Sequence, residues 1–429
     1  MTDETTLTER YQERRKRLMG QVDKGVILIN SSGTAPDKWL KDRNLQYLTG
    51  LTDPNAYLLL APDGVMVERL ETRSTAELMR GRKVHEILFI KALDAKTAFM
   101  DGEAPTLEEI KATTGVDRVY DIGELDTILE GALKANDTLW LNTPNTPAFN
   151  QPLCTYLKFI NQIRQRYYWI QLKNIATKIH VMRYVKDDYE VACLREAFEV
   201  HTEIYNKIMR TIKPGDNESL AEAVFDYEIT SRDAHISSMI EEHYARSIIV
   251  GSGKNTAIPH YMDNNQVIRD GDLVLLDTGV TVNGYSSDIT RTFPANGRFT
   301  PRQRELYAIV LEALYTAIDT MKPGSNALTV HQTVYDVFKR YDLAQYSYGG
   351  CAHPVGLSIH DPNGRWPDDR EQPFEPGVVF VVEPFLVMPH EGMGIRIEDG
   401  VLITETGYEM LAAPPKEIDE LEALCQETG

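Results

Sequence analysis

The sequence predicts a two-domain chain, in which an α/β domain precedes an α+β domain built from two related halves. The chain has 429 residues, more than one ordinary hydrophobic core holds. Over residues 1–178, short apolar segments alternate with helix-like segments, an order typical of α/β domains. Beyond them, a helix, a Lys-Pro-Gly stop and a strand that ends in an acid occur twice.

Composition narrows the classes of protein to which the chain could belong. It is 42% hydrophobic and 25% charged, with a net charge of -19, which argues against nucleic-acid and membrane partners because both carry negative charge. No apolar run approaches the roughly 18 residues of a membrane span, and the N-terminus lacks an apolar signal core. The four scattered cysteines form neither a disulfide framework nor a CxxC pair. We therefore expect a cytoplasmic protein.

The first domain is predicted to consist of strands that alternate with helices. The predicted strands are Gly25–Asn30, Ala56–Ala61, Ile87–Ile90 and Thr138–Leu141. Helices are predicted up to about Arg17 and over Thr106–Thr113 and Gly123–Ala132. Pro62-Asp-Gly64 is expected to close the second strand with a turn. Because no catalytic constellation occurs here, we expect this domain to pack against the rest and to restrict substrates.

A domain boundary is predicted near Ile179–Tyr184, which gives domains of 1–178 and 179–429. Beyond it, Asp187 or Asp188 can cap a long amphipathic helix. Its apolar residues follow the three/four spacing of one buried face: Val191, Leu194, Phe198, Tyr205, Ile208 and Ile212. Lys213-Pro-Gly215 ends this helix. His201 lies on it and is expected to serve packing.

The same Lys-Pro-Gly motif recurs at Lys322-Pro-Gly324, between the helical segments Gln303–Met321 and Leu328–Tyr341. The strand Gly271–Asp277 is likewise echoed by Pro376–Glu383, and each of the two ends in an acid. A recurring tripeptide alone can arise by chance, but the second echo argues against that explanation. The second domain is therefore predicted to bring carboxylates from two related halves to a common centre.

The best-defined element is a hairpin over Leu273–Phe293. Asn283-Gly284 suits a two-residue turn because both residues tolerate positive φ. That turn pairs Gly279 with Asp288 and Asp277 with Thr290, so the two aspartates lie on one face, about 7–8 Å apart at Cα. A surface hairpin with two solvated aspartates is the alternative, and the downstream residues argue against it.

The second half offers two further acids and a histidine. Glu383 ends the strand Val378–Val382, Glu398 is expected in a following strand over Gly394–Gly400, and His353 precedes both. Four acids without a countercharge would repel one another. Oxygen ligands with one nitrogen suit Mn²⁺, Fe²⁺ or Co²⁺. Two such ions sharing a water would give a hydroxide at neutral pH, which is the equipment for hydrolysing an amide or ester.

Several segments resemble one known family. Leu275–Pro294 (LLDTGVTVNGYSSDITRTFP), His353–Asp361 (HPVGLSIHD), Val381–Pro384 (VVEP) and Gly394–Thr404 (GIRIEDGVLIT) are similar to the metal-site segments of the pita-bread metallopeptidases, specifically the aminopeptidase P and prolidase group. Val250–Tyr261, Asp42–Gly50 and Leu88–Ile90 resemble the same group, so the likeness covers nearly the whole chain. It implies an N-terminal α/β domain and a pita-bread catalytic domain with pseudo-two-fold halves.

The resemblance also implies a metal site. Two divalent ions, usually manganese, with cobalt, iron or zinc as alternatives, would be held by five residues. Asp277 and Asp288 would hold one metal, with Asp288 and Glu398 bridging. His353 and Glu383 would complete the second.

Three further roles follow from the resemblance. Glu383 would carry a proton between the bridging water and the leaving proline nitrogen. His260 and His360 would line the substrate site and steady the tetrahedral intermediate. Arg396 would orient carboxylates of the site or of the substrate.

The implied reaction is cleavage of an Xaa-Pro bond at the N-terminus of peptides, by a homodimer or homotetramer. A prolidase acting on dipeptides and an altered pita-bread protein with a binding function are the alternatives. The sequence departs from the family pattern at Gly349, where a histidine is common, and at Phe385, where glycine is typical. It departs again over Pro362–Trp366. These departures concern the choice of substrate, since all five metal ligands are kept.

Overall fold

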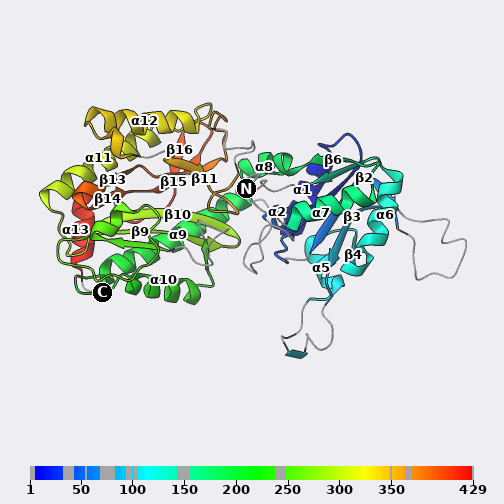
Figure 1. Cartoon of the computed structure of the whole chain (residues 1–429), viewed down its shortest axis with the longest axis horizontal. Helices are drawn as coiled ribbons and strands as arrows, with labels where there is room; N and C mark the ends of the chain where they lie inside the picture. Colours follow the sequence, from blue (N-terminus) through cyan, green and yellow to red (C-terminus); the bar gives the residue numbers. More distant parts are fainter. Residues whose placement is uncertain are drawn as a thin grey trace, which may run out of the picture. The chain divides into compact units, whose positions relative to one another are not determined.

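The computed structural model describes residues 5–31, 43–53, 56–67, 83–92, 99–100, 102, 105–142, 155–237, 248–347, 350–362 and 370–427. The chain divides into two compact units, Met1–His180 and Val181–Gly429, whose elements are labelled in Figure 1. Among the described helices, none combines the length and the apolar character that a membrane crossing requires.

The first unit is built on a 6-stranded sheet with the order β4-β3-β2-β1-β5-β6. Strand β1 pairs antiparallel with β2 and parallel with β5, so the sheet is mixed. Its strands are β1 (Val26–Asn30), β2 (Tyr57–Met66), β3 (Lys83–Ile90), β4 (Arg118–Asp121), β5 (Thr138–Leu141) and β6 (Gln171–Asn174). Its helices are α1 (Leu7–Met19), α2 (Arg43–Thr49), α5 (Leu107–Thr114), η1 (Ile122–Glu124), α6 (Leu125–Ala135) and α7 (Thr155–Arg166).

The predicted strands and helices of this unit are present, with two differences. Strand β2 does not end at the Pro62-Asp-Gly64 turn but continues to Met66, with a register shift between Leu60 and Val65 and a φ of 71° at Gly64. A bulge therefore takes up the residues that we expected to form a terminal turn. Strands β4 and β6 were not predicted, because these edge strands are only partly buried and lack an apolar run.

The second unit contains helices and three sheets. Helix α8 (Ala176–Tyr184) contains the division between the two units. The helices of the second unit that follow it are α9 (Asp188–Thr211), α10 (Ser219–Ser231), η2 (Gly253–Ala257), α11 (Pro301–Ile318), α12 (Ala327–Arg340), η3 (Ala344–Tyr346), η4 (Pro389–Glu391) and α13 (Ile418–Gln426). Its strands are β7 (His235–Ser237), β8 (Ile249–Ser252), β9 (Leu273–Val282), β10 (Tyr285–Pro294), β11 (Ala352–Pro354), β12 (Val379–Val382), β13 (Phe385–Met388), β14 (Met393–Arg396), β15 (Asp399–Ile403) and β16 (Tyr408–Met410).

Helix α9 forms as its sequence predicts. Asp187 caps it in a reciprocal capping box with Glu190, which satisfies two backbone N–H groups that the first turn leaves without partners. Its apolar face, including Leu194, Phe198 and Ile208, is fully buried. The helix packs on β9 and β10, and it therefore supports the hairpin that carries the first two acids.

Two halves of this unit repeat one design. After α9, Gly215 adopts a φ of 102° and donates its N–H to the carbonyl of Ile268 at 2.9 Å. After α11, Gly324 adopts a φ of 84° and donates to Phe374 at the same distance of 2.9 Å. The following asparagines, Asn217 and Asn326, each form an antiparallel bridge. The repetition predicted from the Lys-Pro-Gly motif is thus present in the backbone.

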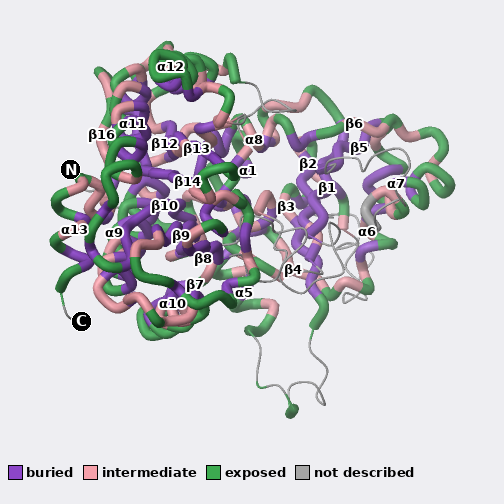
Figure 2. The backbone as a smooth tube through the Cα atoms, turned by 60° about the vertical axis from the view of Figure 1, so that its left-hand side comes forward, coloured by how far each residue is buried: buried purple, intermediate pink, exposed green. Residues whose placement is uncertain are grey.

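The strands of the two halves form separate sheets. The first contains β10-β9-β7, with β8 also paired to β9, and the second has the order β11-β12-β15-β16. Strands β13 and β14 form a third sheet of two strands. Every described residue of β10, β12 and β15 is buried, and Figure 2 shows β10 and β12 in the purple of buried residues. Acidic side chains placed on these strands are therefore withdrawn from water.

Candidate metal centre

The hairpin of the first half places two aspartates as predicted. Asn283 and Gly284 adopt positive φ values of 51° and 86°, which form the tight turn. Strands β9 and β10 then pair Gly279 with Asp288 and Asp277 with Thr290, so the predicted register is confirmed. Asp277 and Asp288 are 2% and 1% exposed, which excludes a solvated surface hairpin.

The second half brings two glutamates alongside each other. Val382 of β12 pairs with Asp399 of β15, and Glu383 and Glu398 each lie one residue beyond that pair. The prediction of one strand over Gly394–Gly400 is wrong, because β14 ends before Glu398 and pairs with β13, whereas β15 pairs with β12. Between them the Glu398 N–H leaves the ladder and donates to the carbonyl of Thr290 at 3.1 Å. Glu398 therefore lies where the backbone changes partners.

His353 lies among three of the acids. Its Nε2 is 3.5 Å from Asp288 Oδ2, 3.7 Å from Glu383 Oε1 and 3.8 Å from Glu398 Oε1. Three overlapping groups can each offer ligand atoms within 4.8 Å of one another. Their members are Asp288, His353 and His360; His353, Glu383 and Glu398; and Asp277, Asp288 and Glu398. The structure thus brings together all five predicted ligands.

The electrostatics of this cluster are those of a site without enough positive charge. Burial, followed by repulsion from neighbouring acids, raises the pKa values of Asp288 and Glu398 well above their usual range. Burial likewise raises the pKa of Glu383 to about 7. Burial, together with the nearby His360, lowers the pKa of His353, which favours the neutral imidazole that binds metals.

Three carboxylate oxygens of the cluster are buried without a hydrogen-bond donor among the described residues: Asp277 Oδ1, Asp288 Oδ1 and Glu398 Oε1. Buried polar atoms nearly always have partners, and unpaired ones indicate a missing water or ion. Oxygen ligands with one imidazole suit a divalent cation of the Mn²⁺ type. The donor set therefore fits the metals that the resemblance implies.

Two of the predicted substrate residues, His360 and Arg396, contact members of the cluster. Arg396 is buried and forms an ion pair with Asp277, and its Nη2 also donates to the carbonyl of Pro259 at 3.2 Å. His260 follows Pro259 and is exposed. The His360 ring lies 4.1 Å from that of His353, centroid to centroid, and is also exposed. Both histidines can thus be reached from solvent, as a substrate contact requires.

The residue that follows His360 is held by buried charges. Asp361 Oδ1 accepts from Arg183 Nη2 at 2.5 Å, and its Oδ2 lies 3.5 Å from Lys186 Nζ. Burial alone would raise the pKa of Asp361, but Arg183 and Lys186 hold this pKa below its usual value. The ion pairs of Asp361 with Arg183 and Lys186 therefore hold the backbone next to His360 in place.

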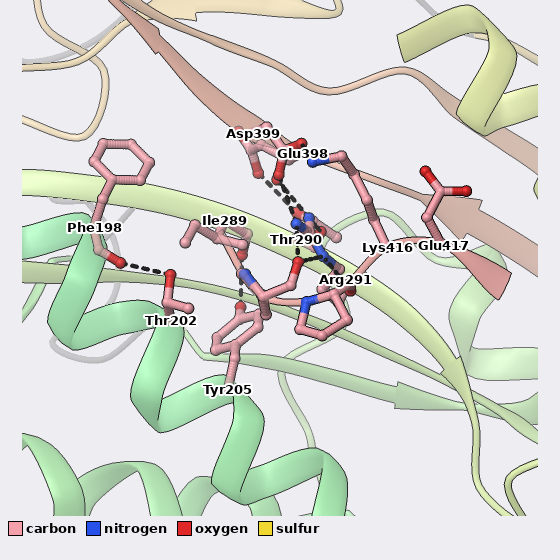
Figure 3. Close-up of polar contacts among 12 residues, drawn as sticks. Phe198, Thr202, Tyr205, Ile289, Thr290, Arg291, Glu398, Asp399, Lys416 and Glu417 are labelled. Carbon is pink, nitrogen blue, oxygen red and sulfur yellow. Dashed lines mark hydrogen bonds and ion pairs between the residues drawn. The ribbon is translucent and has the colours of Figure 1, made fainter. Parts of the chain in front are cut away.

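Sequence reasoning missed several residues that support the centre. Figure 3 shows Thr290 and Arg291 of β10 beside Glu398 and Asp399. Arg291 is fully buried and forms an ion pair with Asp399 at 2.6 Å. The spacing of the five ligands gave no signal for them, because basic and hydroxyl residues within a strand usually face solvent. Their position two and three residues after Asp288 on the same strand was the available signal.

His201 does more than pack. It is fully buried, and its Nδ1 lies 3.0 Å from Ser287 Oγ and its Nε2 2.9 Å from Thr278 Oγ1. These two residues adjoin Asp288 and Asp277 in sequence. Helix α9 is therefore tied by hydrogen bonds to both strands of the hairpin.

Of the predicted departures, only Phe385 lies wholly within the described residues. It opens β13 and pairs with Arg396, and is partly buried. Gly349 lies outside the described residues, as do residues 363–366 of the departing segment Pro362–Trp366.

Comparison with known proteins gives consistent matches over the whole chain. The family model of metallopeptidase family M24 matches residues 192–405, and that of the aminopeptidase P N-terminal domain matches residues 11–140. The Xaa-Pro aminopeptidase of Escherichia coli is 30% identical, and the match covers 97% of both chains. Among solved structures, E. coli aminopeptidase P with the inhibitor Pro-Leu matches at a TM-score of 0.81, with 28% identity and 99% of both chains covered. A zinc-substituted E. coli aminopeptidase P in complex with product matches at 0.79, again with 28% identity and 99% of both chains covered. These matches and the repeated halves confirm the predicted fold class, an α/β domain followed by a pita-bread domain.

Proposed function

Because the chain belongs to metallopeptidase family M24, in the group that carries the aminopeptidase P N-terminal domain, we propose that it removes the N-terminal residue from peptides with proline in second position. It is a metallo-hydrolase of the Xaa-Pro aminopeptidase type. The observation that supports this activity best is the convergence of one imidazole and four carboxylates in a largely buried cluster, three of whose oxygens have no donor among the described residues.

Five residues would hold the metals: Asp277, Asp288, His353, Glu383 and Glu398. Two Mn²⁺ ions are proposed, with Co²⁺, Fe²⁺ or Zn²⁺ as alternatives, because four carboxylates need more positive charge than one cation supplies. Bound there, the cations would supply Lewis-acid activation of a water and of the scissile carbonyl.

The chain's own groups would bind the peptide and transfer the proton. Glu383, whose pKa burial raises to about 7, would take a proton on its carboxylate and return it to the departing proline nitrogen. His260 and His360, both exposed, would contact the substrate and steady the tetrahedral intermediate. Arg396 would hold Asp277 in place through their ion pair.

The proposed bond has an unusual chemistry. A proline nitrogen in a peptide carries no hydrogen, so its departure as an amine depends on a correctly placed proton donor. Glu383, a partly buried member of the cluster, is suited to that task, since its pKa of about 7 allows both protonation states near neutral pH.

The test is hydrolysis of an Xaa-Pro-Yaa tripeptide and of the corresponding Xaa-Pro dipeptide, with Mn²⁺ and with a chelator. We expect Mn²⁺-dependent release of the first residue from the tripeptide and loss of activity on chelation. Activity that survives complete metal removal would contradict the proposal. Preference for the dipeptide would assign a prolidase, and metal binding without hydrolysis of any peptide would assign a binding function.

Two further features belong to this proposal. The protein is proposed to act in the cytoplasm, since the described cysteines Cys193, Cys351 and Cys425 are free and buried, as a reducing compartment allows. It is proposed to assemble as a homodimer or homotetramer. Light scattering in solution measures that assembly directly.

A further inference from the structure

The residues that follow Asp288 on β10 join the two halves at the cluster. Thr290 lies two residues from Asp288 and shares its face of the strand. Its Oγ1 donates to Glu398 Oε2 at 2.8 Å, and its carbonyl accepts from the Glu398 N–H at 3.1 Å. The hydroxyl and the carbonyl oxygen of Thr290, in the first half, thus both bind Glu398 of the second half.

Arg291 reinforces this junction from the opposite face of β10. Its Nη1 donates to the carbonyls of Thr290 at 2.8 Å and Glu398 at 2.7 Å, and its Nη2 donates to Asp399 Oδ1 at 2.6 Å. Lys416 Nζ lies 2.7 Å from the other oxygen of Asp399. Figure 3 shows these side chains converging on the backbone at Glu398. The Glu398 backbone therefore has little freedom, and its side chain alone remains to be oriented.

The Thr290 hydroxyl supplies that orientation. By engaging Oε2, it leaves Glu398 Oε1 as the oxygen that is buried without a donor among the described residues. That same Oε1 lies 3.8 Å from His353 Nε2, and Glu398 belongs to both the His353–Glu383 and the Asp277–Asp288 groups. We propose that Thr290 is a positioning residue, whose hydroxyl selects which oxygen of Glu398 faces the metals and so sets the affinity of the centre. This inference rests on the proposed function, since it takes Glu398 as a metal ligand.

The expected size of the effect follows from the geometry. With a metal bound, Glu398 would be a carboxylate, and the hydroxyl would bond it inside a fully buried environment, where a hydrogen bond is stronger than in water. Loss of a residue that orients a metal ligand weakens metal binding about 10- to 100-fold. Valine has nearly the shape of threonine and suits a strand, so Thr290→Val removes the hydroxyl with little change of packing.

The experiment measures the Kd for Mn²⁺ by calorimetry on metal-stripped protein, together with thermal unfolding of the metal-free forms. We expect Thr290→Val to weaken Mn²⁺ binding about 10- to 100-fold. Thr290→Ser, which restores the hydroxyl, is expected to bind within about threefold of wild type, less than the loss on removing an orienting group. The matched control is Thr281→Val in the same hairpin, where the lost hydroxyl bonds Ser286 at 3.0 Å and no other described residue. The Mn²⁺ affinity of this variant should equal that of wild type.

Each outcome decides the inference. Unchanged affinity in Thr290→Val, or an equal loss in Thr281→Val, would overturn the orienting role while leaving the proposed function intact. Failure of Thr290→Ser to recover affinity would show that packing rather than the hydroxyl matters, and would also overturn it. A wild-type protein that takes up no Mn²⁺ would overturn the proposed function and this inference together.

Discussion

Replacing Glu218 by glutamine should destabilise the second unit, although the two side chains have the same shape. The Glu218 side chain is fully buried. Its Oε1 accepts from the Ser252 N–H at 2.7 Å, from Ser252 Oγ at 2.7 Å and from Asn255 Nδ2 at 3.1 Å. Its Oε2 accepts from Tyr261 OH at 3.0 Å and from the Gln266 N–H at 3.0 Å. All five donors belong to the segment that carries His260.

The magnitude follows from the backbone donors. Hydroxyl groups can rotate and accept, but the N–H groups of Ser252 and Gln266 can only donate, and each oxygen of Glu218 faces one of them. Either orientation of a glutamine amide therefore directs its NH₂ at a backbone N–H. The glutamine NH₂ and the backbone N–H that it faces would then both be buried donors without an acceptor. Each costs about 1–3 kcal/mol, or about 4 kcal/mol together, against a total stability of about 5–15 kcal/mol.

Thermal unfolding of the metal-free protein measures this loss. At about 2–4 °C per kcal/mol for a domain of this size, Glu218→Gln should lower Tm by about 8–16 °C. Tyr261→Phe is the control, since it removes one donor and leaves Oε2 with the Gln266 N–H; we expect a loss of about 1 kcal/mol. A Glu218→Gln protein that melts within about 2 °C of wild type, less than 1 kcal/mol would give, would refute the reasoning.

Two further predictions concern close packing and pH. A Cβ at Gly394 would lie 1.9 Å from the carbonyl oxygen of Thr256, so Gly394→Ala should displace β14 and lower Tm by several degrees. Gly407→Ala is the control and should leave Tm nearly unchanged, because a Cβ there would have no atom within 4 Å. Equal Tm values for the two variants would contradict the packing argument. Because the pKa of Asp361 is lowered on folding, its stabilisation is complete above the unfolded pKa of about 3.9 and is lost as pH falls through the lower folded value. The Tm difference between wild type and Asp361→Asn should therefore shrink from pH 5 to pH 3. A Tm difference that grows over this range would contradict the stabilising role of the ionised Asp361.

Local rules were sufficient for the first half of the centre. A two-residue turn fixes the register of a hairpin, so Asn283-Gly284 alone determined the pairing of Asp277 with Thr290. The cap and the apolar spacing likewise defined α9. These features depend on neighbours in sequence, which is why they could be predicted.

The second half depends on long-range contacts and was predicted less well. The residues around Glu398 read as one continuous strand, yet the backbone changes partners there because Thr290, far away in sequence, accepts its N–H. Glu218 gave no signal either, since its five donors lie 34 or more residues further along the chain. Nothing in a local pattern indicates that a glutamate will be enclosed in this way.

The junction between the halves has a consequence for how the protein is made. Asp277 and Asp288 leave the ribosome close together, but Glu398 follows 110 residues after Asp288 (398 − 288), and its contact with Thr290 can form only then. The mutually repelling carboxylates are therefore not enclosed with one another until the second half has been synthesised. A cation that needs all four of them could bind only after both halves have folded and come together.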